Sequence, residues 1–147
     1  MSKIVDRLVC RQLVNFLERN KLLPSHQSAY RRYHSTETAM LRIVSDLLLA
    51  CDRGQVSLFA LLDLSAAFDT VDHEILLDRL HQAFGIRGSA LEWIRSLVTG
   101  RVQRFVLARE KSVESSVTCG VPQGSVLGPI LFLLYCAEVS HIAECNK

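Results

Sequence analysis

The sequence is poor in the residues that make a chain flexible. Of its 147 residues only 3 are proline and 7 are glycine, and no low-complexity tract interrupts it. Hydrophobic residues make up 49% and charged residues 22%, which is the composition of a globular protein and excludes an intrinsically disordered one. The length suffices for one core of ordinary size and is too short for two independent domains. We therefore expect one domain or a piece of one.

Cysteine pairs of the C-x-x-C type, which bind zinc or carry out redox chemistry, do not occur in the sequence. The five cysteines are odd in number and widely scattered: Cys10, Cys51, Cys119, Cys136 and Cys145. This usage predicts reduced thiols in an intracellular protein.

Long hydrophobic runs and charge of one sign are also scarce. The first 20 residues carry a charge every three or four positions, so they lack the uninterrupted apolar core of a signal peptide. The apolar stretch at 126–139 contains Pro129 and Glu138 and is shorter than the roughly 20 residues that span a bilayer. It predicts a buried helix and no membrane association. A net charge of +2 gives no strong signature of nucleic-acid binding, so such binding must depend on where the basic residues lie.

Hydrophobic periodicity predicts a mixed α+β fold with helices packed on a small sheet. Helices are expected over 3–19, between Ser35 and Gly54, over 73–84, over 88–98 and after the sequence VPQGS. In the first of these Asp6 is expected to face outward. Residues 56–63, VSLFALLD, are continuously apolar and predict a strand buried on both faces. Alternating residues at 101–108 and 112–120 predict a hairpin that turns at 109–111.

Acidic residues follow the predicted strand in LLDLSAAFDTVDHEILL, residues 61–77. Asp63 at the strand end suits a ligand-facing group, or else a turn residue bonded to nearby backbone N–H groups. Asp69 and Asp72 flank the next helix, where an acid caps free N–H groups. His73 suits a general base, but a lone histidine in a first helical turn is more often exposed.

A glycine-rich turn occurs in CGVPQGSVLGPILF, residues 119–132. Gly120, Gly124 and Gly128 surround Gln123, and Ser125 can cap the helix that follows. A turn of this kind before a helix N-terminus suits a phosphate or nucleotide, although strand-to-helix turns use the same residues for local reasons.

Basic and aromatic residues alternate in QSAYRRYHSTET, residues 27–38. Arg31 and Arg32 stand between Tyr30 and Tyr33, a mixture of cation and stacking face that suits a nucleic-acid strand. The other interpretation is a solvated basic turn.

In this order the three stretches resemble the reverse transcriptase (RNA-directed DNA polymerase) domain of non-LTR, LINE-type retrotransposons. HQSAYRRYHSTETAM is similar to a segment of the polymerase fingers, LFALLDLSAAFDTVDHEIL to polymerase motif A, and GVPQGSVLGPILF to motif B. The resemblance runs from about residue 3 to residue 140, so residues 1–147 are expected to form a partial reverse transcriptase domain. It implies an α+β fingers and palm fragment of a right-hand polymerase, with helices on a small antiparallel sheet.

The resemblance also implies roles for particular residues. Asp63 would be the catalytic aspartate that binds Mg²⁺ in a two-metal site, together with the backbone carbonyl of Leu64. The nucleotide-binding residues would be Phe68, which excludes a 2′-hydroxyl, the small Ala67, and Gln123 with Gly124. From the fingers, Arg31 would face the template or the nucleotide, and Arg32 would be a further contact to the template or another nucleic-acid strand. The partners would be an RNA template, a DNA primer, dNTPs and the remainder of a retroelement polyprotein, in the nucleus or the cytoplasm.

The sequence departs from the family in lacking the Y/F-A-D-D hairpin of motif C, which supplies a further catalytic aspartate, the R-P-I-S-like segment of the fingers, and the thumb. We therefore expect a fragment without detectable polymerase activity, with exposed apolar surface and an exposed sheet edge. The alternative is a non-enzymatic fragment that acts as an RNA- or protein-binding module.

Overall fold

The structure, a computed structural model, describes residues 3–24, 26–108 and 110–145, with side chains as far as Val139. It divides into two compact units. The helical unit comprises Met1–Leu23 and Ala66–Lys147, and the inserted unit comprises Pro24–Ser65. Each is described here by itself.

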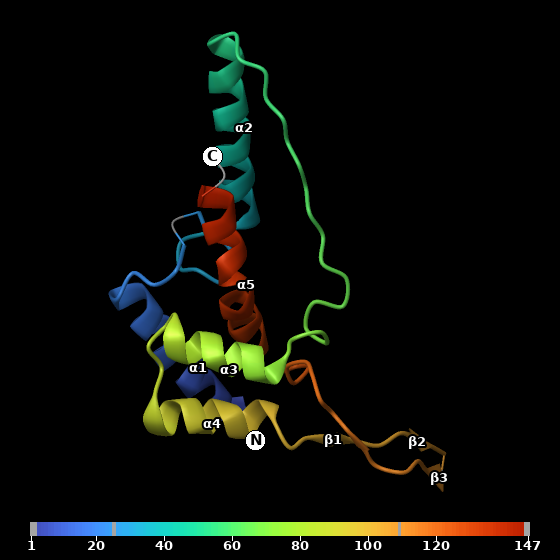
Figure 1. Ribbon diagram of the computed structural model, residues 1–147. Helices are drawn as coiled ribbons and strands as arrows, with labels where there is room; N and C mark the ends of the chain where they lie inside the picture. The colour runs from blue at the N-terminus through green and yellow to red at the C-terminus, as the bar shows by residue number, and fades with distance from the viewer. Residues whose placement is uncertain (1–2, 25, 109, 146–147) are drawn as a thin grey trace. The chain divides into compact units, whose positions relative to one another are not determined.

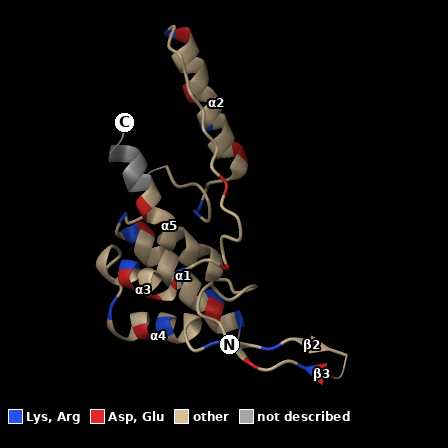
Figure 2. Cartoon of the chain, turned by 45° about the vertical axis from the view of Figure 1, so that its right-hand side comes forward, with Lys and Arg blue, Asp and Glu red and all other residues tan. Residues whose placement is uncertain are grey.

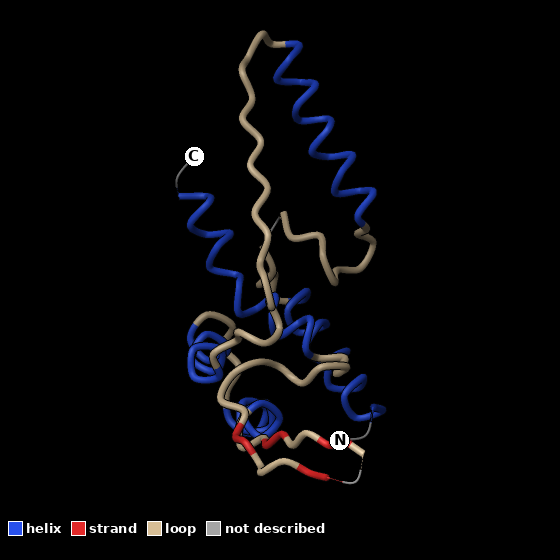
Figure 3. Tube along the Cα trace, turned by 90° about the vertical axis from the view of Figure 1, so that its right-hand side faces the viewer, coloured by secondary structure: helices blue, strands red, loops and turns tan. Residues whose placement is uncertain are grey.

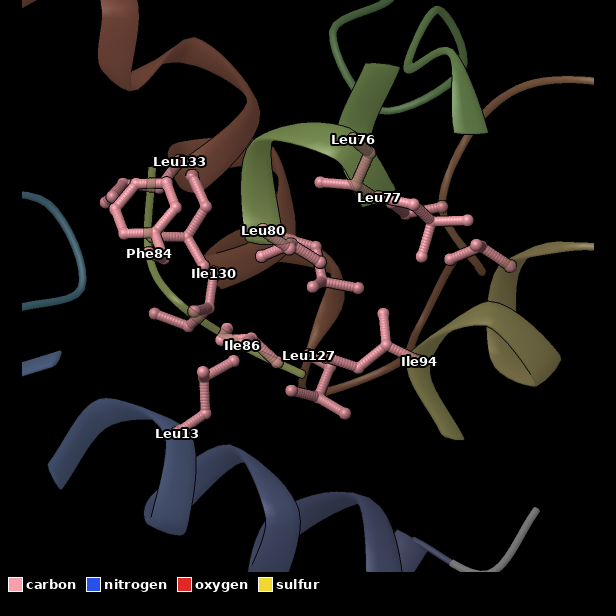
Figure 4. Close-up of a cluster of buried hydrophobic side chains, with 14 of the residues drawn as sticks. Leu13, Leu76, Leu77, Leu80, Phe84, Ile86, Ile94, Leu127, Ile130 and Leu133 are labelled. Carbon is pink, nitrogen blue, oxygen red and sulfur yellow. The ribbon is translucent and has the colours of Figure 1, made fainter. Parts of the chain in front are cut away.

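Within its described residues, the helical unit contains four helices around one hydrophobic core. They are α1 (Lys3–Arg19), α3 (His73–Gln82), α4 (Gly88–Val98) and α5 (Gly128–Cys145). Figure 4 shows side chains from all four meeting: Leu13 of α1, Leu76, Leu77 and Leu80 of α3, Ile94 of α4, and Ile130 and Leu133 of α5. Leu17, Leu76, Leu80, Leu127, Leu131 and Leu134 are fully buried. The four predicted helices are confirmed, with α3 ending two residues earlier than expected.

Helix α1 buries only part of its predicted apolar stripe. Leu13 and Leu17 lie in the core, whereas Ile4 is 77% exposed and Leu8 56%. The prediction that Asp6 faces outward is wrong, because its side chain is only 6% exposed. Its carboxylate accepts a hydrogen bond from the backbone N–H of Val126, 2.6 Å away and 120 residues later in the chain. A partner that distant in sequence leaves no trace in helical periodicity.

The predicted hairpin is confirmed. Strand β1 (Val102–Gln103) pairs antiparallel with β4 (Ser115–Ser116), and β2 (Val106–Leu107) pairs antiparallel with β3 (Glu110–Lys111). Figure 1 shows the hairpin running away from α4. The turn prediction is wrong for Glu110 and Lys111, which form β3, while Arg109 lies outside the described residues.

Mixed helices and small antiparallel sheets are thus present, but the helices do not pack on a sheet. Every strand residue is exposed, and the helices pack against one another instead. Both signs of charge occur along the hairpin (Figure 2), where Arg104 pairs with Glu114. None of the described helices combines the length and hydropathy that a membrane-spanning helix requires.

The described part of the inserted unit contains one helix, α2 (Thr36–Asp52). Ser35 caps it as predicted, in a capping box. The Ser35 hydroxyl accepts from the N–H of Thr38 at 3.2 Å, and the Thr38 hydroxyl accepts from the N–H of Ser35 at 2.9 Å. Local hydrogen bonds of this kind set the start of the helix, although no residue of α2 is buried.

The predicted buried strand at 56–63 is wrong. These residues form an extended loop after α2, drawn in tan in Figure 3. Strands need partners for their backbone N–H and C=O groups, and none of the described segments pairs with this one. Its apolar side chains are consequently uncovered, with Val56, Leu58 and Leu62 at least 86% exposed. The exposed apolar surface expected from the sequence is therefore present.

Candidate functional site

The segments that resemble polymerase motifs A and B meet in the helical unit, through backbone hydrogen bonds. Residues 68–73 lie beside residues 119–123, and we call this pair of segments the motif junction. The N–H of Val121 donates to the carbonyl of Phe68 at 2.8 Å, and the N–H of Gly120 donates to the carbonyl of Val71 at 2.7 Å. An antiparallel bridge between Asp72 and Cys119 extends the contact. The junction thus joins segments about 50 residues apart in sequence.

Gly120 allows this close approach. Its φ is +84°, a conformation that residues with a Cβ rarely adopt. A Cβ built at this position would lie 3.0 Å from the Cα of Asp69 and 3.0 Å from the carbonyl oxygen of Phe68. Glycine is therefore required at residue 120 both by the backbone angle and by the neighbouring backbone.

Gln123 is bonded to Asp69 across the motif junction. Its side-chain Nε2 donates to Asp69 Oδ1 at 3.0 Å. The prediction that Asp69 caps the following helix is wrong; that role belongs to Asp72 alone. Asp72 Oδ1 accepts from the N–H groups of Glu74 at 2.9 Å and Ile75 at 3.0 Å, which confirms its predicted role as the N-cap of α3.

His73 is a structural residue of the motif junction. It is only 6% exposed, so the expectation that it is exposed is wrong. Its Nε2 lies 2.9 Å from the carbonyl oxygen of Gly120, and because a carbonyl only accepts, Nε2 carries the hydrogen. The guanidinium of Arg101 donates to the same oxygen. With Nε2 engaged in this way, the base role considered from the sequence finds no support.

The glycine-rich turn has its helix N-terminus already occupied by protein groups. Ser125 Oγ accepts from the N–H of Gly128 at 2.8 Å, which confirms its predicted cap of α5. The N–H of Val126 binds the Asp6 carboxylate. These two N–H groups are therefore already engaged by protein side chains. Gly124 has φ +77° and open space around its Cβ position.

Phe68 is the residue of the motif junction whose side chain contacts α5. Its ring meets the ring of Phe132 edge to face, with centroids 5.3 Å apart and an angle of 62° between the planes. The side chain remains 38% exposed, while its neighbour Ala67 is half-buried. An aromatic ring that is held by a neighbouring ring and is partly exposed can contact a flat or ring-shaped ligand.

Asp63 and Leu64 belong to the inserted unit, whereas Phe68 and Gln123 belong to the helical unit. The Asp63 side chain is exposed, and its Oδ1 accepts from the N–H of Leu64 at 2.9 Å. This contact matches the turn-residue interpretation of Asp63 and leaves Oδ2 without a hydrogen bond among the described residues.

A carboxylate and a neighbouring carbonyl are hard oxygen donors of the kind Mg²⁺ prefers. The described residues contain no group of three His, Cys, Asp or Glu side chains that could hold a metal ion. The donor chemistry at Asp63 therefore fits a magnesium ligand, but this part of the chain does not complete a metal site.

Arg31 and Arg32 have different environments in the inserted unit. The Arg31 guanidinium donates to the carbonyls of Pro24 at 3.3 Å and Gln27 at 3.4 Å, which ties it to its own loop. The Arg32 guanidinium lies 4.8 Å from the centroid of the Tyr33 ring, and Tyr33 is 85% exposed. A cation stacked on an open ring can contact a nucleic-acid strand or solvent alike.

Sequence reasoning gave the wrong environment for two residues that organise the helical unit. Asp6 and His73 are buried polar residues whose partners lie 120 and 47 residues away. The local pattern placed Asp6 on the outward face of its helix and His73 in an exposed first turn, because it contains no sign of either distant partner.

Comparison with known proteins identifies the family. Residues 1–145 match the family described as "Reverse transcriptase (RNA-dependent DNA polymerase)". The chain is 37% identical over 140 residues to the probable RNA-directed DNA polymerase from transposon X-element of Drosophila melanogaster, covering 92% of this chain and 15% of the relative.

Other relatives agree. The chain is 31% identical over 157 residues to the probable RNA-directed DNA polymerase from transposon BS of Drosophila melanogaster, covering 100% of this chain and 17% of the relative. It is 30% identical over 139 residues to the RNA-directed DNA polymerase from mobile element jockey of Drosophila melanogaster, covering 95% of this chain and 15% of the relative. The chain thus spans between 15% and 17% of the length of these curated relatives. It belongs to the reverse transcriptase family, among the RNA-directed DNA polymerases of non-LTR retrotransposons.

Proposed function

We propose that this chain forms the nucleotide-facing part of an RNA-directed DNA polymerase, which adds dNTPs to a primer 3′-hydroxyl under the direction of an RNA template. The observation that carries the proposal is the motif junction. It places Phe68 and Gln123 on adjoining segments, with Val121 N–H 2.8 Å from the Phe68 carbonyl and Gln123 bonded to Asp69. Two residues assigned to nucleotide contact by family resemblance thus lie on segments that are hydrogen-bonded to each other.

At this junction Phe68 acts as a steric gate. Its supported ring would lie under the sugar of the incoming nucleotide, where a 2′-hydroxyl would collide with it, so dNTPs are preferred over rNTPs. Gln123 contacts the nucleotide and the template base. Ala67 and Gly124 carry little or no side chain, and this lets the nucleotide approach the backbone closely.

Asp63 is the catalytic aspartate of this proposal and, with the Leu64 carbonyl, a ligand of Mg²⁺. Bound Mg²⁺ supplies charge neutralisation at the phosphoryl group and activation of the attacking hydroxyl. The exposed Asp63 carboxylate keeps one oxygen for such a ligand while the other is held by the Leu64 N–H. Further carboxylates, phosphate oxygens and water would complete the coordination.

Arg31 and Arg32 contact the backbone of the RNA template or the primer. The longer relatives suggest that further parts of a retroelement polyprotein complete the enzyme. Such an enzyme works inside the cell, in the nucleus, the cytoplasm or both.

A chimeric polymerase tests the proposal. Residues 1–145 replace the matching segment of the X-element polymerase, and dNTP incorporation is measured on a primed RNA template with Mg²⁺. We expect incorporation, and Asp63→Ala should lower it by about 10²–10³-fold. Asp46→Ala, which removes an exposed carboxylate from α2, is the matched control and should leave the rate unchanged. Equal rates for Asp63→Ala and the unsubstituted chimera would refute the assignment.

The isolated chain should show no incorporation, because its described residues do not complete a metal site. Incorporation by the purified chain that Asp63→Ala abolishes would contradict this expectation.

A second function, an RNA-binding module without catalysis, is favoured by the exposed pair of Arg32 and Tyr33. It predicts that the isolated chain binds RNA with an affinity that falls steeply as salt rises, and that Arg32→Ala weakens this binding. RNA binding together with an inactive chimera would favour this second function over the first.

A further inference from the structure

We propose that Asp69 is a positioning residue for Gln123: it holds the amide in one orientation, with the carbonyl oxygen Oε1 left to face the incoming nucleotide. The inference rests on the proposed function for its consequence in catalysis, but the positioning itself is a property of the chain. The motifs alone predict neither the pairing of Asp69 with Gln123 nor the orientation of the Gln123 amide, because the two residues lie 54 positions apart in sequence.

The orientation follows from the chemistry of the two groups. A glutamine amide has a donor end, Nε2, and an acceptor end, Oε1, and rotation by half a turn exchanges them. A carboxylate only accepts hydrogen bonds, so the end of Gln123 that meets Asp69 Oδ1 at 3.0 Å is the donor Nε2. Oε1 is then the end that remains for a ligand.

The backbone around Asp69 keeps this pairing in register. The N–H of Asp69 donates to the carbonyl of Ala66 at 2.9 Å, which closes the turn before it. Val121 is bonded to Phe68 and Gly120 to Val71, one on each side of Asp69. Any side chain at Gly120 would press on the Asp69 backbone. The two residues therefore meet because their segments are joined, and the side-chain bond selects the rotamer and orientation of Gln123.

For the polymerase the consequence concerns binding of the nucleotide. Without Asp69 the exposed Gln123 side chain samples several rotamers and both amide orientations, and the nucleotide must restore one of them on binding. A hydrogen bond of this exposed type contributes modestly, so KM for dNTPs should rise about three- to tenfold while kcat changes little.

Nuclear magnetic resonance of the ¹⁵N-labelled chain tests the positioning directly. The side-chain NH₂ signals of Gln123, assigned with Gln123→Glu, should show nuclear Overhauser contacts to the β protons of residue 69. Asp69→Ala should shift these signals to the position of a freely rotating glutamine. Asp69→Asn keeps the size of the side chain but can donate as well as accept, so it should also release the fixed orientation.

The chain offers a matched control. Gln82 donates from its Nε2 to Asp78 Oδ1 on α3, which is the same exposed type of hydrogen bond away from the motif junction. Asp78→Ala should change the Gln82 signals and leave those of Gln123 unaltered. Gln123 signals that remain the same in Asp69→Ala would overturn the proposal.

The chimeric polymerase separates this inference from the proposed function. A threefold or greater rise in KM for dNTPs in Asp69→Ala, with kcat within twofold and no change in Asp78→Ala, supports the positioning role. An unchanged KM, or a fall in kcat alone, overturns its catalytic consequence. An inactive unsubstituted chimera together with Asp69-dependent Gln123 signals refutes the proposed function and leaves the positioning of Gln123 supported.

Discussion

Gly120 offers the sharpest quantitative test of the motif junction. In Gly120→Ala the backbone of residue 120 has to keep its φ of +84°. For a residue with a Cβ this conformation costs about 1–2 kcal/mol. The methyl also meets three backbone atoms of Phe68 and Asp69 at 3.0–3.1 Å. Backbone atoms move aside less easily than the end of a flexible side chain, so overpacking adds about 1–3 kcal/mol to the loss of stability. The expected loss in the free energy of unfolding is about 2–5 kcal/mol, a large part of the stability of a typical domain.

The control for this prediction is Gly100→Ala, at the end of α4. Gly100 has φ +66°, but a Cβ there would meet nothing within 4 Å, so only the conformational part of the cost applies. Trp93 is the only tryptophan and lies half-buried on α4, so its fluorescence follows urea unfolding of the helical unit. Gly120→Ala should lose about 1–3 kcal/mol more than Gly100→Ala. Equal losses would show that the segments do not approach as closely as the structure has them.

Three further predictions concern single side chains. Asp6→Ala leaves the N–H of Val126 without its partner and should destabilise the helical unit by about 1–3 kcal/mol in the same urea assay, with Asp6→Asn milder because it keeps an acceptor. Ser35→Ala removes the capping box of α2 and should lower its stability by about 1 kcal/mol, seen as reduced helicity in far-UV circular dichroism; unchanged helicity would contradict the cap. Burial, and secondly the negative charge of Asp6, raise the pKa of the Cys10 thiol. Cys10 should therefore be alkylated more slowly than the exposed Cys51, as followed by mass spectrometry over time. In Asp6→Asn the alkylation of Cys10 should be faster, because the negative charge is removed. Because the native pKa is the higher one, this thiol's contribution to stability is full below the pKa of an unfolded cysteine, about 8.5, and is lost as the pH rises through the raised native value.

Features encoded by neighbouring residues could be predicted from the sequence. The Ser35 and Asp72 caps each depend on N–H groups two or three residues away, so a short stretch of sequence contains all their partners. The helices follow from apolar spacing for the same reason. The hairpin could be predicted because its strands are adjacent in the chain. Its register, with Leu107 opposite Glu110, could not be read from the alternation of polar and apolar residues.

Features that depend on distant partners could not be predicted. An apolar run such as 56–63 predicts burial, but whether it becomes a strand depends on a pairing segment, and none of the described segments supplies one. The bond between Asp69 and Gln123 joins two motifs whose roles were inferred separately. Family resemblance assigned Gln123 to the nucleotide, yet a motif states which residues recur and not which of them touch one another.

The contact between Asp6 and Val126 has a consequence for how the protein folds. The helical unit is assembled from two stretches of chain separated by the inserted unit, and the bond that fastens α1 to the start of α5 spans 120 residues. On a ribosome working at about 5–20 residues per second, synthesis of the intervening chain takes roughly 6 to 24 s. During that interval Leu13 and Leu17 have left or are leaving the ribosome before the α5 side chains that cover them have been made. The apolar face of α1 therefore has to wait for part of its hydrophobic core until α5 has been made.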